Sequence, residues 1–332
     1  MATIMGYLVT GGTGFLGSHL VTALHARGDD VVAMGRDPAR CAALERQGVE
    51  TIQCDLSDKA NVDLGFAGAE VVFHVAALSA PWGTYREFHA ANVTATQNVV
   101  HAALRNGVRR LVLVSSPSVT LDGADQVETD ETKAYPRKFL SAYQLTKKLA
   151  EDIANDAGGQ IEVVILRPKA IFGPGDRALL PRLVAAARSG HLRQIGDGAN
   201  LVDVTYVGNV VDALRLAANA PKAPGHTYII TNGEHIPLWP LLRRVLAAAG
   251  CDPHLRSAPW PIAYGVATLM EWKARCTHVE PPLTRYSVTL LGKTQTYSIA
   301  AARRDLGYAP LISVDDAIEI TLPWLRGLRS SE

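Results

Sequence analysis

A tyrosine and a lysine four positions apart are the residues of this sequence best suited to proton transfer. Tyr143 and Lys147 lie in a stretch with a helical pattern, so they share one face of the predicted helix. A phenol titrates near pH 10, so it exchanges protons near neutrality only with help. A neighbouring ammonium group favours the phenolate, and lowering its pKa by about three units corresponds to about 4 kcal/mol. The pair therefore predicts acid–base chemistry on a carbonyl or alcohol oxygen.

A hydroxyl for the substrate oxygen is expected at the end of a strand that precedes this pair. The apolar run over residues 110–115 predicts a strand, and Ser116 follows it directly. Ser116 is expected to hold the substrate oxygen by a hydrogen bond. Ser118 is the alternative, because the position of the strand tip is ambiguous by a residue or two. The Tyr-x-x-x-Lys spacing is common by itself, so its place after this strand gives it weight.

A glycine-rich turn, Thr10-Gly11-Gly12-Thr13-Gly14-Phe15-Leu16-Gly17, connects the first predicted strand (3–9) to a predicted helix (15–26). Glycine has no Cβ, so the backbone N–H groups can approach a pyrophosphate closely. The helix N-terminus adds partial positive charge there. In this strand–turn–helix context the turn predicts a dinucleotide site. Its expected members are Gly11, Gly14, Phe15, Leu16 and Gly17.

The choice of dinucleotide is decided at the end of the second predicted strand, in Met34-Gly35-Arg36-Asp37. An NAD-binding protein usually has Asp or Glu there to hold the ribose 2′-hydroxyl. Here Gly35 would leave room for a 2′-phosphate and Arg36 would bind it, with Arg40 one turn further on. Asp37 could still face the ribose. The pattern favours NADP(H) and leaves NAD(H) open.

Short β-rich runs alternate with helix-length segments through the first half of the chain. Strands are expected at 30–34, 50–53, 70–75, 110–115 and 163–166, with further helices at 39–47 and about 88–106. This alternation predicts an α/β fold with a Rossmann-type, doubly wound parallel sheet. Strands at 202–207 and 227–231 follow. We expect a dinucleotide-binding domain over 1–166, with a return contribution from about 200–232. A smaller C-terminal substrate lobe is expected over 167–199 and 233–332.

Composition excludes several other classes of protein. Lys plus Arg number 33 against 32 for Asp plus Glu, so there is no electrostatic reason to expect nucleic acid as a partner. The four cysteines include no CxxC pair, which predicts reduced thiols and no metal site. The N-terminal residues lack signal-peptide features. The apolar segment 258–272 is interrupted by Pro259, Pro261 and Glu271 and is too short to span a bilayer. We therefore expect a cytoplasmic protein.

Several residues have more than one interpretation. The apolar side chains of 260–272 are expected by default to pack on the protein's own lobe, with a lid or peripheral membrane contact as alternatives. His74 is interpreted as a satisfied, partly buried histidine, and Lys169 as a ligand for a substrate carboxylate or a solvated loop residue. The aromatic residues Trp82, Tyr85 and Phe88 have two interpretations: they line an apolar substrate pocket, or they pack in the core.

The motifs, taken in order, resemble those of extended short-chain dehydrogenases/reductases over roughly the first two-thirds of the chain. They are the glycine turn, Asp55-Leu56, His74-Val75-Ala76-Ala77, Asn92-Val93, the serine-tipped strand, Tyr143 with Lys147, and Arg167-Pro168. Further stretches resemble the 3β-hydroxysteroid dehydrogenase branch, which includes sterol-4α-carboxylate 3-dehydrogenases and bacterial 2-alkyl-3-oxoalkanoate reductases. These stretches are Ala80-Pro81-Trp82-Gly83, Ser116-Pro117-Ser118-Val119, Thr205-Tyr206-Val207-Gly208-Asn209-Val210 and Pro281-Pro282-Leu283-Thr284-Arg285.

The resemblance implies a role for each matching residue. Tyr143 would be the proton donor or acceptor, Lys147 would lower its pKa and bind the nicotinamide ribose, and Ser116 would orient the carbonyl. Asn92 would be structural or part of a proton path. A homodimer is also implied. The remaining cofactor contacts would be Asp55 and Leu56 beside adenine, Ala76 and Ala77 near ribose and phosphates, and Pro168 to Ile171 near the nicotinamide.

The predicted function is hydride transfer between a nicotinamide cofactor and a small hydrophobic β-keto/β-hydroxy acid or 3β-hydroxysteroid-like substrate. A nucleotide-sugar epimerase using transient oxidation by bound NAD is the alternative. Such epimerases tend to carry an arginine where this chain has Ala199-Asn200-Leu201-Val202-Asp203, although Arg193 lies slightly upstream. A non-catalytic dinucleotide sensor is a third class, but sensors usually lose the Tyr/Lys pair.

Overall fold

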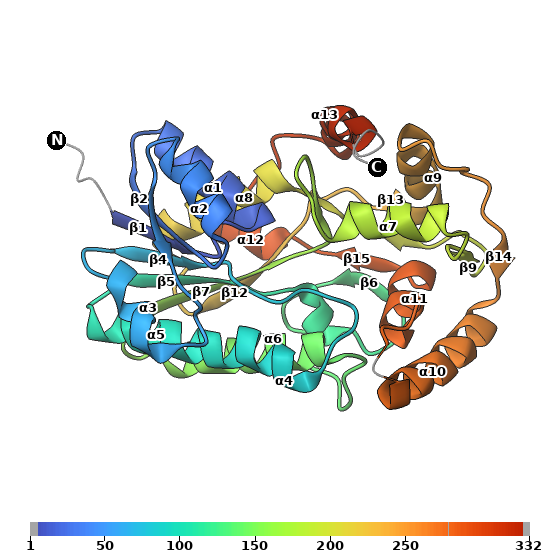
Figure 1. Ribbon diagram of the computed structural model, residues 1–332, viewed down its shortest axis with the longest axis horizontal. Helices are drawn as coiled ribbons and strands as arrows, with labels where there is room; N and C mark the ends of the chain where they lie inside the picture. Colours follow the sequence, from blue (N-terminus) through green and yellow to red (C-terminus); the bar gives the residue numbers. More distant parts are fainter. Residues whose placement is uncertain (1–5, 278, 328–332) are drawn as a thin grey trace.

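A seven-stranded parallel sheet forms the centre of the molecule (Figure 1). The computed structural model describes residues 6–277 and 279–327. The strand order is β3-β2-β1-β4-β5-β7-β12, and every neighbouring pair is parallel. The strands are β1 (Gly6–Thr10), β2 (Asp30–Gly35), β3 (Glu50–Gln53), β4 (Val71–His74), β5 (Arg110–Val114), β7 (Glu162–Pro168) and β12 (His226–Ile230). The predicted α/β, Rossmann-type fold is confirmed; residues 3–5 of the first predicted strand lie outside the described residues.

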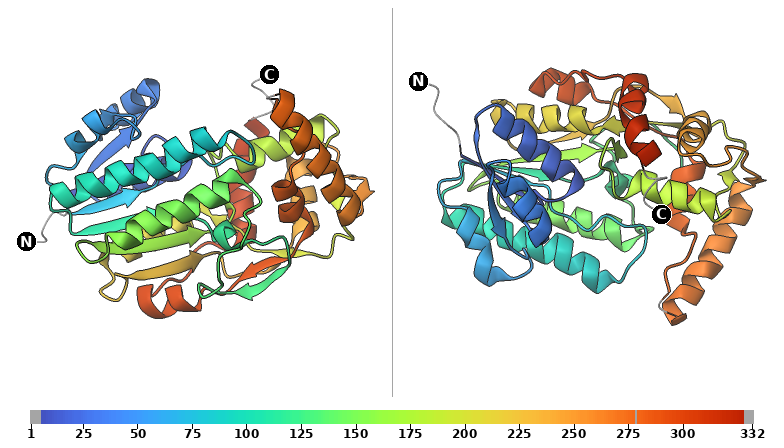
Figure 2. Two further views of the ribbon diagram at one scale, coloured as in Figure 1. Left: turned by 90° about the horizontal axis from the view of Figure 1, so that it is seen from below. Right: turned by 45° about the horizontal axis from the view of Figure 1, so that its top comes forward.

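Helices cover both faces of this sheet, which is why its strands are apolar on both sides. Successive side chains of a strand alternate between faces, so Val9 belongs to one core cluster and Leu8 to the other. The helices around the sheet are α1 (Phe15–Ala26), α2 (Pro38–Glu45), α3 (Lys59–Val62), α5 (Ala95–Arg105), α6 (Ala142–Asp156), α8 (Val207–Asn219) and α12 (Ala300–Leu306). The α1 bounds agree with the predicted helix. Figure 2 shows α5 and α6 side by side on one face.

Two of the predicted elements differ from the structure. The predicted strand over 202–207 is two short strands, β10 (Leu201–Val202) and β11 (Thr205–Tyr206), and α8 begins at Val207. The helix follows β11 directly, so the apolar residues of the strand run into those of the helix without a break in the sequence. The buried residues of α8 recur at helical spacing. The helix predicted over about 88–106 is α4 (Tyr85–Phe88), a π-helical turn (His89–Thr94) and α5.

A second lobe with its own core lies beyond the carboxyl ends of the strands. Its four-stranded sheet has the order β13-β10-β15-β6 and recruits β6 from the first half of the chain. Besides β10 and β11, the strands outside the large sheet are β6 (Gln126–Thr129), β8 (Ile171–Phe172), β9 (Gln194–Ile195), β13 (Ile236–Pro237), β14 (Ser257–Ala258) and β15 (Gln295–Tyr297). The lobe's helices are α7 (Leu179–Arg188), α9 (Leu238–Ala248), α10 (Trp260–Thr277), α11 (Arg285–Gly292) and α13 (Val314–Gly327). Short 3₁₀ turns occupy Asp63–Gly65 and Pro117–Thr120.

The apolar stretch 260–272 is part of α10, which lies along the outer side of the lobe (Figure 2). The expectation that its large apolar side chains pack on the lobe holds for Trp260 and Tyr264, which lie against the lobe's core, and is wrong for Leu269 and Trp272, which are each 69% exposed. The helix instead buries its small residues, including Ala263 and Ala267, which allow close approach to the lobe. Ile262, Val266, Leu269 and Trp272 form the exposed side of α10. Among residues 6–277 and 279–327, none of the helices combines the length and apolar character needed to cross a bilayer.

A buried ion pair fastens α6 to β7. The Arg167 guanidinium donates from Nε and Nη2 to the two carboxylate oxygens of Glu151 at 2.8 and 2.7 Å. Their side chains are 5% and 1% exposed. Tyr135 adds a hydrogen bond to the same carboxylate at 2.7 Å. Because α6 carries Tyr143 and Lys147, this pair fixes the helix that presents them.

Replacing Glu151 with alanine should therefore destabilise the protein strongly. The substitution leaves the Arg167 charge buried without its partner, which typically costs about 3–5 kcal/mol. Urea denaturation measures the free energy of unfolding. The matched control is Asp152→Ala on the same helix, which removes the more exposed pair with Lys148 and should cost less than about 1 kcal/mol. Equal losses in the two variants would contradict the role given to Glu151.

Candidate active site

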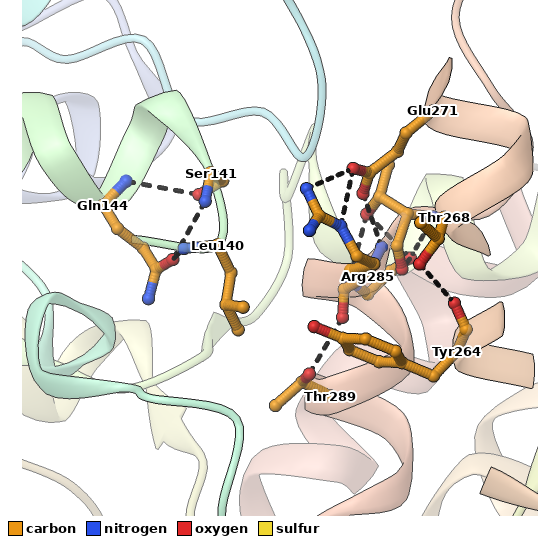
Figure 3. A network of polar contacts seen from close by, with 10 residues as sticks. Leu140, Ser141, Gln144, Tyr264, Thr268, Glu271, Arg285 and Thr289 are labelled. Carbon is orange, nitrogen blue, oxygen red and sulfur yellow. Dashed lines mark hydrogen bonds and ion pairs between the residues drawn. The ribbon is translucent and has the colours of Figure 1, made fainter. Parts of the chain in front are cut away.

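The N-terminus of α6 is tied to the loop that follows β5. Ser141 caps the helix by accepting from the Gln144 N–H at 3.3 Å, and the Gln144 side chain accepts from the N–H groups of Leu140 and Ser141 (Figure 3). The Gln144 Nε2 donates to the carbonyl oxygens of Ser118 and Leu121 at 2.7 and 3.0 Å. These bonds bring Tyr143, in the first turn of α6, beside the serine loop.

Two serine hydroxyls lie together in that loop. The Oγ atoms of Ser116 and Ser118 are 2.9 Å apart, and Ser116 Oγ also accepts from the Ser118 N–H. Burial raises the pKa of the Tyr143 phenol, while hydrogen bonding with Ser79 and Ser116 acts in the opposite direction. Of the two serines, Ser116 is therefore the one that hydrogen-bonds with Tyr143.

Lys147 lies one helical turn from Tyr143, as the spacing predicts, and is buried. Its Nζ donates to the carbonyl oxygen of Val114 at 2.6 Å, at the end of β5. Burial lowers the pKa of Lys147 to about 8, and Glu151 acts against that change. In the protein alone the pKa of Tyr143 is raised, so the expected lowering is not achieved by Lys147 alone.

Three neighbouring polar residues are accounted for by contacts within the protein. His74 is buried, and its ring nitrogens contact the hydroxyls of Thr10 and Thr96 at 2.7 and 3.0 Å. Burial lowers its pKa to about 3, so the ring stays neutral. Asn92 donates to Thr146 of α6 at 3.0 Å. Lys169 is buried and donates to Gln295 Oε1 at 2.5 Å, so the interpretation as a solvated loop residue is wrong.

The glycine turn has the geometry of a pyrophosphate cradle. Gly11 has a φ of +70°, and a Cβ there would lie 2.7 Å from the Ala76 backbone. A Cβ on Gly17 would lie 2.1 Å from the Gly11 carbonyl oxygen. In the described part of the chain no side chain caps α1, whose N-cap is Gly14. Phe15 and Leu16 form the first turn, so the predicted phosphate-binding residues come together around N–H groups suited to an anion.

The end of β2 adds a packing reason for one predicted residue and places another. Gly35 is buried, and a Cβ there would lie 2.2 Å from Thr13 Oγ1. Glycine is therefore required by packing under the turn, whether or not a phosphate also lies there. Asp37 caps α2 by accepting from the N–H groups of Ala39 and Arg40 at 3.1 and 3.3 Å. Because its carboxylate is engaged in this cap, it is a poor candidate for the ribose 2′-hydroxyl.

Positive charge gathers at this edge of the turn. Arg36 is exposed and lies 3.9 Å from Asp55, so these two predicted cofactor contacts are neighbours; Leu56 beside them is buried. Arg177, which sequence reasoning missed, donates from Nη1 to the Thr13 carbonyl oxygen at 3.4 Å. Burial lowers the pKa of Arg177, and the charge of Arg40 lowers it further. Arg177 follows the sequence Gly-Pro-Gly-Asp, which is typical of a turn but carries no local sign that the segment returns to Thr13.

Two further predicted contacts lie at the carboxyl end of β7. Pro168 ends that strand and Ile171 begins β8, which pairs with β11. Between them Ala170 has a φ of +43°, a left-handed conformation that side chains other than glycine adopt at some cost. Ala76 and Ala77 follow β4, with Ala76 against Gly11. These predicted residues therefore lie at the same end of the sheet as the glycine turn.

A second tyrosine, also missed from the sequence, faces the serine pair from the second lobe. Tyr286 is in α11 and only 8% exposed. Burial raises its pKa; Tyr143 raises it further, and a hydrogen bond with Ser118 acts against them. Arg285 next to it donates from its backbone N–H and Nε to Glu271 of α10 at 2.6 and 2.8 Å (Figure 3).

The parallel sheet, the glycine turn and the Ser/Tyr/Lys set define an NAD(P)-dependent dehydrogenase or reductase of the extended short-chain group. Comparison with known proteins narrows this class. The model of the 3-beta hydroxysteroid dehydrogenase/isomerase family matches residues 8–258, and the chain belongs to that family. The resemblance read from the sequence is thereby confirmed.

Two named relatives match nearly the whole chain. A 2-alkyl-3-oxoalkanoate reductase of Stenotrophomonas maltophilia is 41% identical, over 95% of this chain and 97% of the relative. A decarboxylating sterol-4-alpha-carboxylate 3-dehydrogenase of Saccharomyces cerevisiae is 35% identical, over 98% and 99%. Among solved structures, MoeE5 in complex with UDP-glucose and NAD is 28% identical with a TM-score of 0.75, over 98% of this chain and 100% of that chain.

The close packing at Gly17 gives a test of the glycine turn. Gly17→Ala should weaken NADPH binding by about tenfold or more, because the new Cβ displaces the turn whose N–H groups would hold the pyrophosphate. Fluorescence titration gives the Kd, and thermal unfolding confirms that the variant is folded. Gly159→Ala is the control, since a Cβ there meets nothing within 4 Å. An unchanged Kd in folded Gly17→Ala would refute the assignment.

Proposed function

We propose that this protein transfers a hydride between NADP(H) and a hydrophobic β-keto/β-hydroxy acid or 3β-hydroxysteroid-like substrate. The observation that carries the proposal is the setting of Tyr143. Its phenol hydrogen-bonds with Ser116 and lies one helical turn from the buried Lys147. Both residues are at the end of the sheet where the glycine turn lies. Acid–base groups beside a dinucleotide cradle are what carbonyl reduction needs.

The chain's own residues would hold the substrate oxygen and move its proton. Ser116 donates a hydrogen bond to the carbonyl oxygen, and Tyr143 donates the proton that completes the hydroxyl. In the direction of alcohol oxidation Tyr143 accepts that proton. The bound nicotinamide supplies or accepts the hydride at the substrate carbon.

Lys147 would have two tasks in this arrangement. Its ammonium is fixed by the Val114 carbonyl oxygen, so it can bind the nicotinamide ribose without moving far. Together with the positive charge of an oxidised nicotinamide it would lower the pKa of Tyr143. That effect has to overcome the rise caused by burial, and about three units below the ordinary value corresponds to about 4 kcal/mol.

The charges at the end of β2 support NADP(H) as the cofactor. Arg36 and Arg40 follow β2, and Arg177 reaches the same turn at Thr13. Asp37, the nearest acidic candidate for the 2′-hydroxyl, caps α2 and pairs with Arg40. Arginine holds phosphate through charge-assisted hydrogen bonds, whereas a 2′-hydroxyl gains little from a cluster of cations. The observation that favours NAD(H) is the Asp55 carboxylate, which lies 3.9 Å from Arg36 and is an acidic side chain of the kind that holds a ribose 2′-hydroxyl.

The relatives' names support the substrate class. In both relatives' names, the substrate carries an oxygen at carbon 3 and a carboxylate on the neighbouring carbon. On this chain, Trp82 is partly buried, which suits an apolar substrate. Phe88, whose ring is 6.3 Å from that of Tyr143, is only 1% exposed and belongs to the core. Tyr85 is 50% exposed and contributes less. A homodimer, a cytoplasmic location and the two-domain division remain predictions.

A nucleotide-sugar epimerase is the alternative, favoured by the likeness to MoeE5 in complex with UDP-glucose and NAD. Against it, residues 199–203 provide no arginine for a diphosphate. Asn200 donates to the carbonyl oxygens of Leu291 and Lys293, and Asp203 is buried against His235. NAD that co-purifies with the protein, with turnover of a UDP-sugar in the absence of added cofactor, would support the alternative.

Tyr143→Phe should abolish turnover while leaving NADPH affinity nearly unchanged, because the ring stays and only the proton-carrying hydroxyl is lost. Absorbance of NADPH and NADH is followed separately with a 2-alkyl-3-ketoacid, a 3-ketosteroid and a UDP-sugar. General acid–base catalysis contributes roughly 10²- to 10⁴-fold, which sets the smallest loss expected. Retained turnover by the variant would refute the role of Tyr143.

Arg36→Ala should reduce kcat/KM with NADPH by about 10- to 100-fold and leave kcat/KM with NADH within about twofold. The estimate takes 1.5–3 kcal/mol for hydrogen bonds to a charged group, with about 1.4 kcal/mol for each tenfold. Arg27→Ala is the control, an exposed arginine paired with Asp29 after α1. Equal losses with the two cofactors would argue against 2′-phosphate recognition.

A further inference from the structure

Tyr286 is held at the active site by the second lobe. The Glu271 carboxylate receives the backbone N–H and the guanidinium of Arg285, so α10 fixes the first turn of α11 (Figure 3). Thr284 caps the same turn through a reciprocal pair with Ser287. The residue between these anchors is Tyr286, whose hydroxyl hydrogen-bonds with Ser118 and whose pKa is raised by burial and by the nearby Tyr143.

The site therefore has more hydroxyl groups than a reacting carbonyl can use. A carbonyl oxygen has two lone pairs, which Tyr143 and Ser116 would occupy. Ser118 and Tyr286 remain; both are buried and hydrogen-bond with each other, and Ser118 Oγ also bonds with Ser116 Oγ. The Tyr297 hydroxyl, which interacts electrostatically with Tyr286, is buried and has no hydrogen-bond partner among the residues that the structure describes. The row of hydroxyls thus continues from Ser116 past the place of the carbonyl oxygen, which suits a second polar group on the substrate.

The spacing of the serines limits where that group is attached. With the Ser116 and Ser118 Oγ atoms 2.9 Å apart, the two serines are placed to contact two substrate oxygens that are near neighbours. The oxygens of a 3-oxo group and of a carboxylate on the adjacent carbon can approach each other in this way. We propose that Tyr286, with Ser118, binds the carboxylate of a β-keto or β-hydroxy acid and so selects such acids over ketones without one. This assignment rests on the proposed function.

The two phenols would then have different tasks. Tyr143 lies one turn from the Lys147 ammonium, so it can exchange a proton. Burial and the nearby Tyr143 both raise the pKa of Tyr286, so it stays protonated and remains a hydrogen-bond donor throughout the reaction. Tyr286 is thus a substrate-binding residue that sets specificity, and its loss should change which ketones react more than it changes proton transfer.

The test compares Tyr286→Phe with the unmodified protein on a 2-alkyl-3-ketoacid and on the ketone formed from it by loss of CO₂. We expect kcat/KM for the acid to fall by about 10- to 100-fold, as for a lost hydrogen bond to a charged group, and kcat/KM for the ketone to stay within about threefold. Tyr264→Phe is the matched control, because it removes a phenol from α10 whose ring stacks on Trp260. Equal losses on acid and ketone, or none on the acid, overturn the proposal.

A binding measurement separates this proposal from the proposed function. Calorimetric titration of the NADP⁺-loaded protein with an unreactive 2-alkylalkanoate should give a Kd about 10- to 100-fold weaker in Tyr286→Phe and unchanged in Tyr264→Phe. If the unmodified protein turned over neither acid nor ketone, the proposed function would fail, and this titration would still decide the role of Tyr286. An equal Kd in Tyr286→Phe and the unmodified protein overturns it.

Discussion

The Gln144 side-chain amide is the contact on which the active site depends. It is fully buried and accepts from the two N–H groups before α6 while donating to two carbonyl oxygens of the serine loop. One side chain therefore satisfies four backbone groups that would otherwise be buried without partners. Because the loop follows β5 and the helix carries Tyr143, this amide fixes the distance between hydroxyl and phenol. It joins the loop that carries Ser116 directly to the helix that carries Tyr143.

The sheet was predictable because its strands carry one strong signal. Buried on both faces, they read as apolar runs separated by helix-length segments, and the α1 and β3 bounds agree with the prediction. The second lobe gives no such signal, because its strands are two to four residues long and pair across large sequence separations, as β6 does with β15. Apolar runs do not separate the elements at residues 202–207, since apolar residues of two strands and a helix follow one another directly there.

The candidate site divides in the same way. Gly17, Tyr143 and Lys147 could be found because their relations are local, within one turn or one helix. Arg177 and Tyr286 could not, because they reach the glycine turn and the serine loop from segments more than 160 residues away in the sequence. Gly35 and Asp37 were found, but their structural tasks were not, since packing under Thr13 and capping of α2 cannot be told apart from cofactor contacts in the sequence.

The packing of α10 reverses the usual relation between side-chain size and tolerance to mutation. Elsewhere in the protein the large apolar residues are the ones that must be kept. On α10, Ile262, Val266, Leu269 and Trp272 face outward. Ala263, Ala267 and Ala274 make close contact with the lobe, where an added methylene group would push the helices apart. In related chains we expect the outward positions to drift freely among polar and apolar types, while the three small residues record the fixed spacing between α10 and the rest of its lobe.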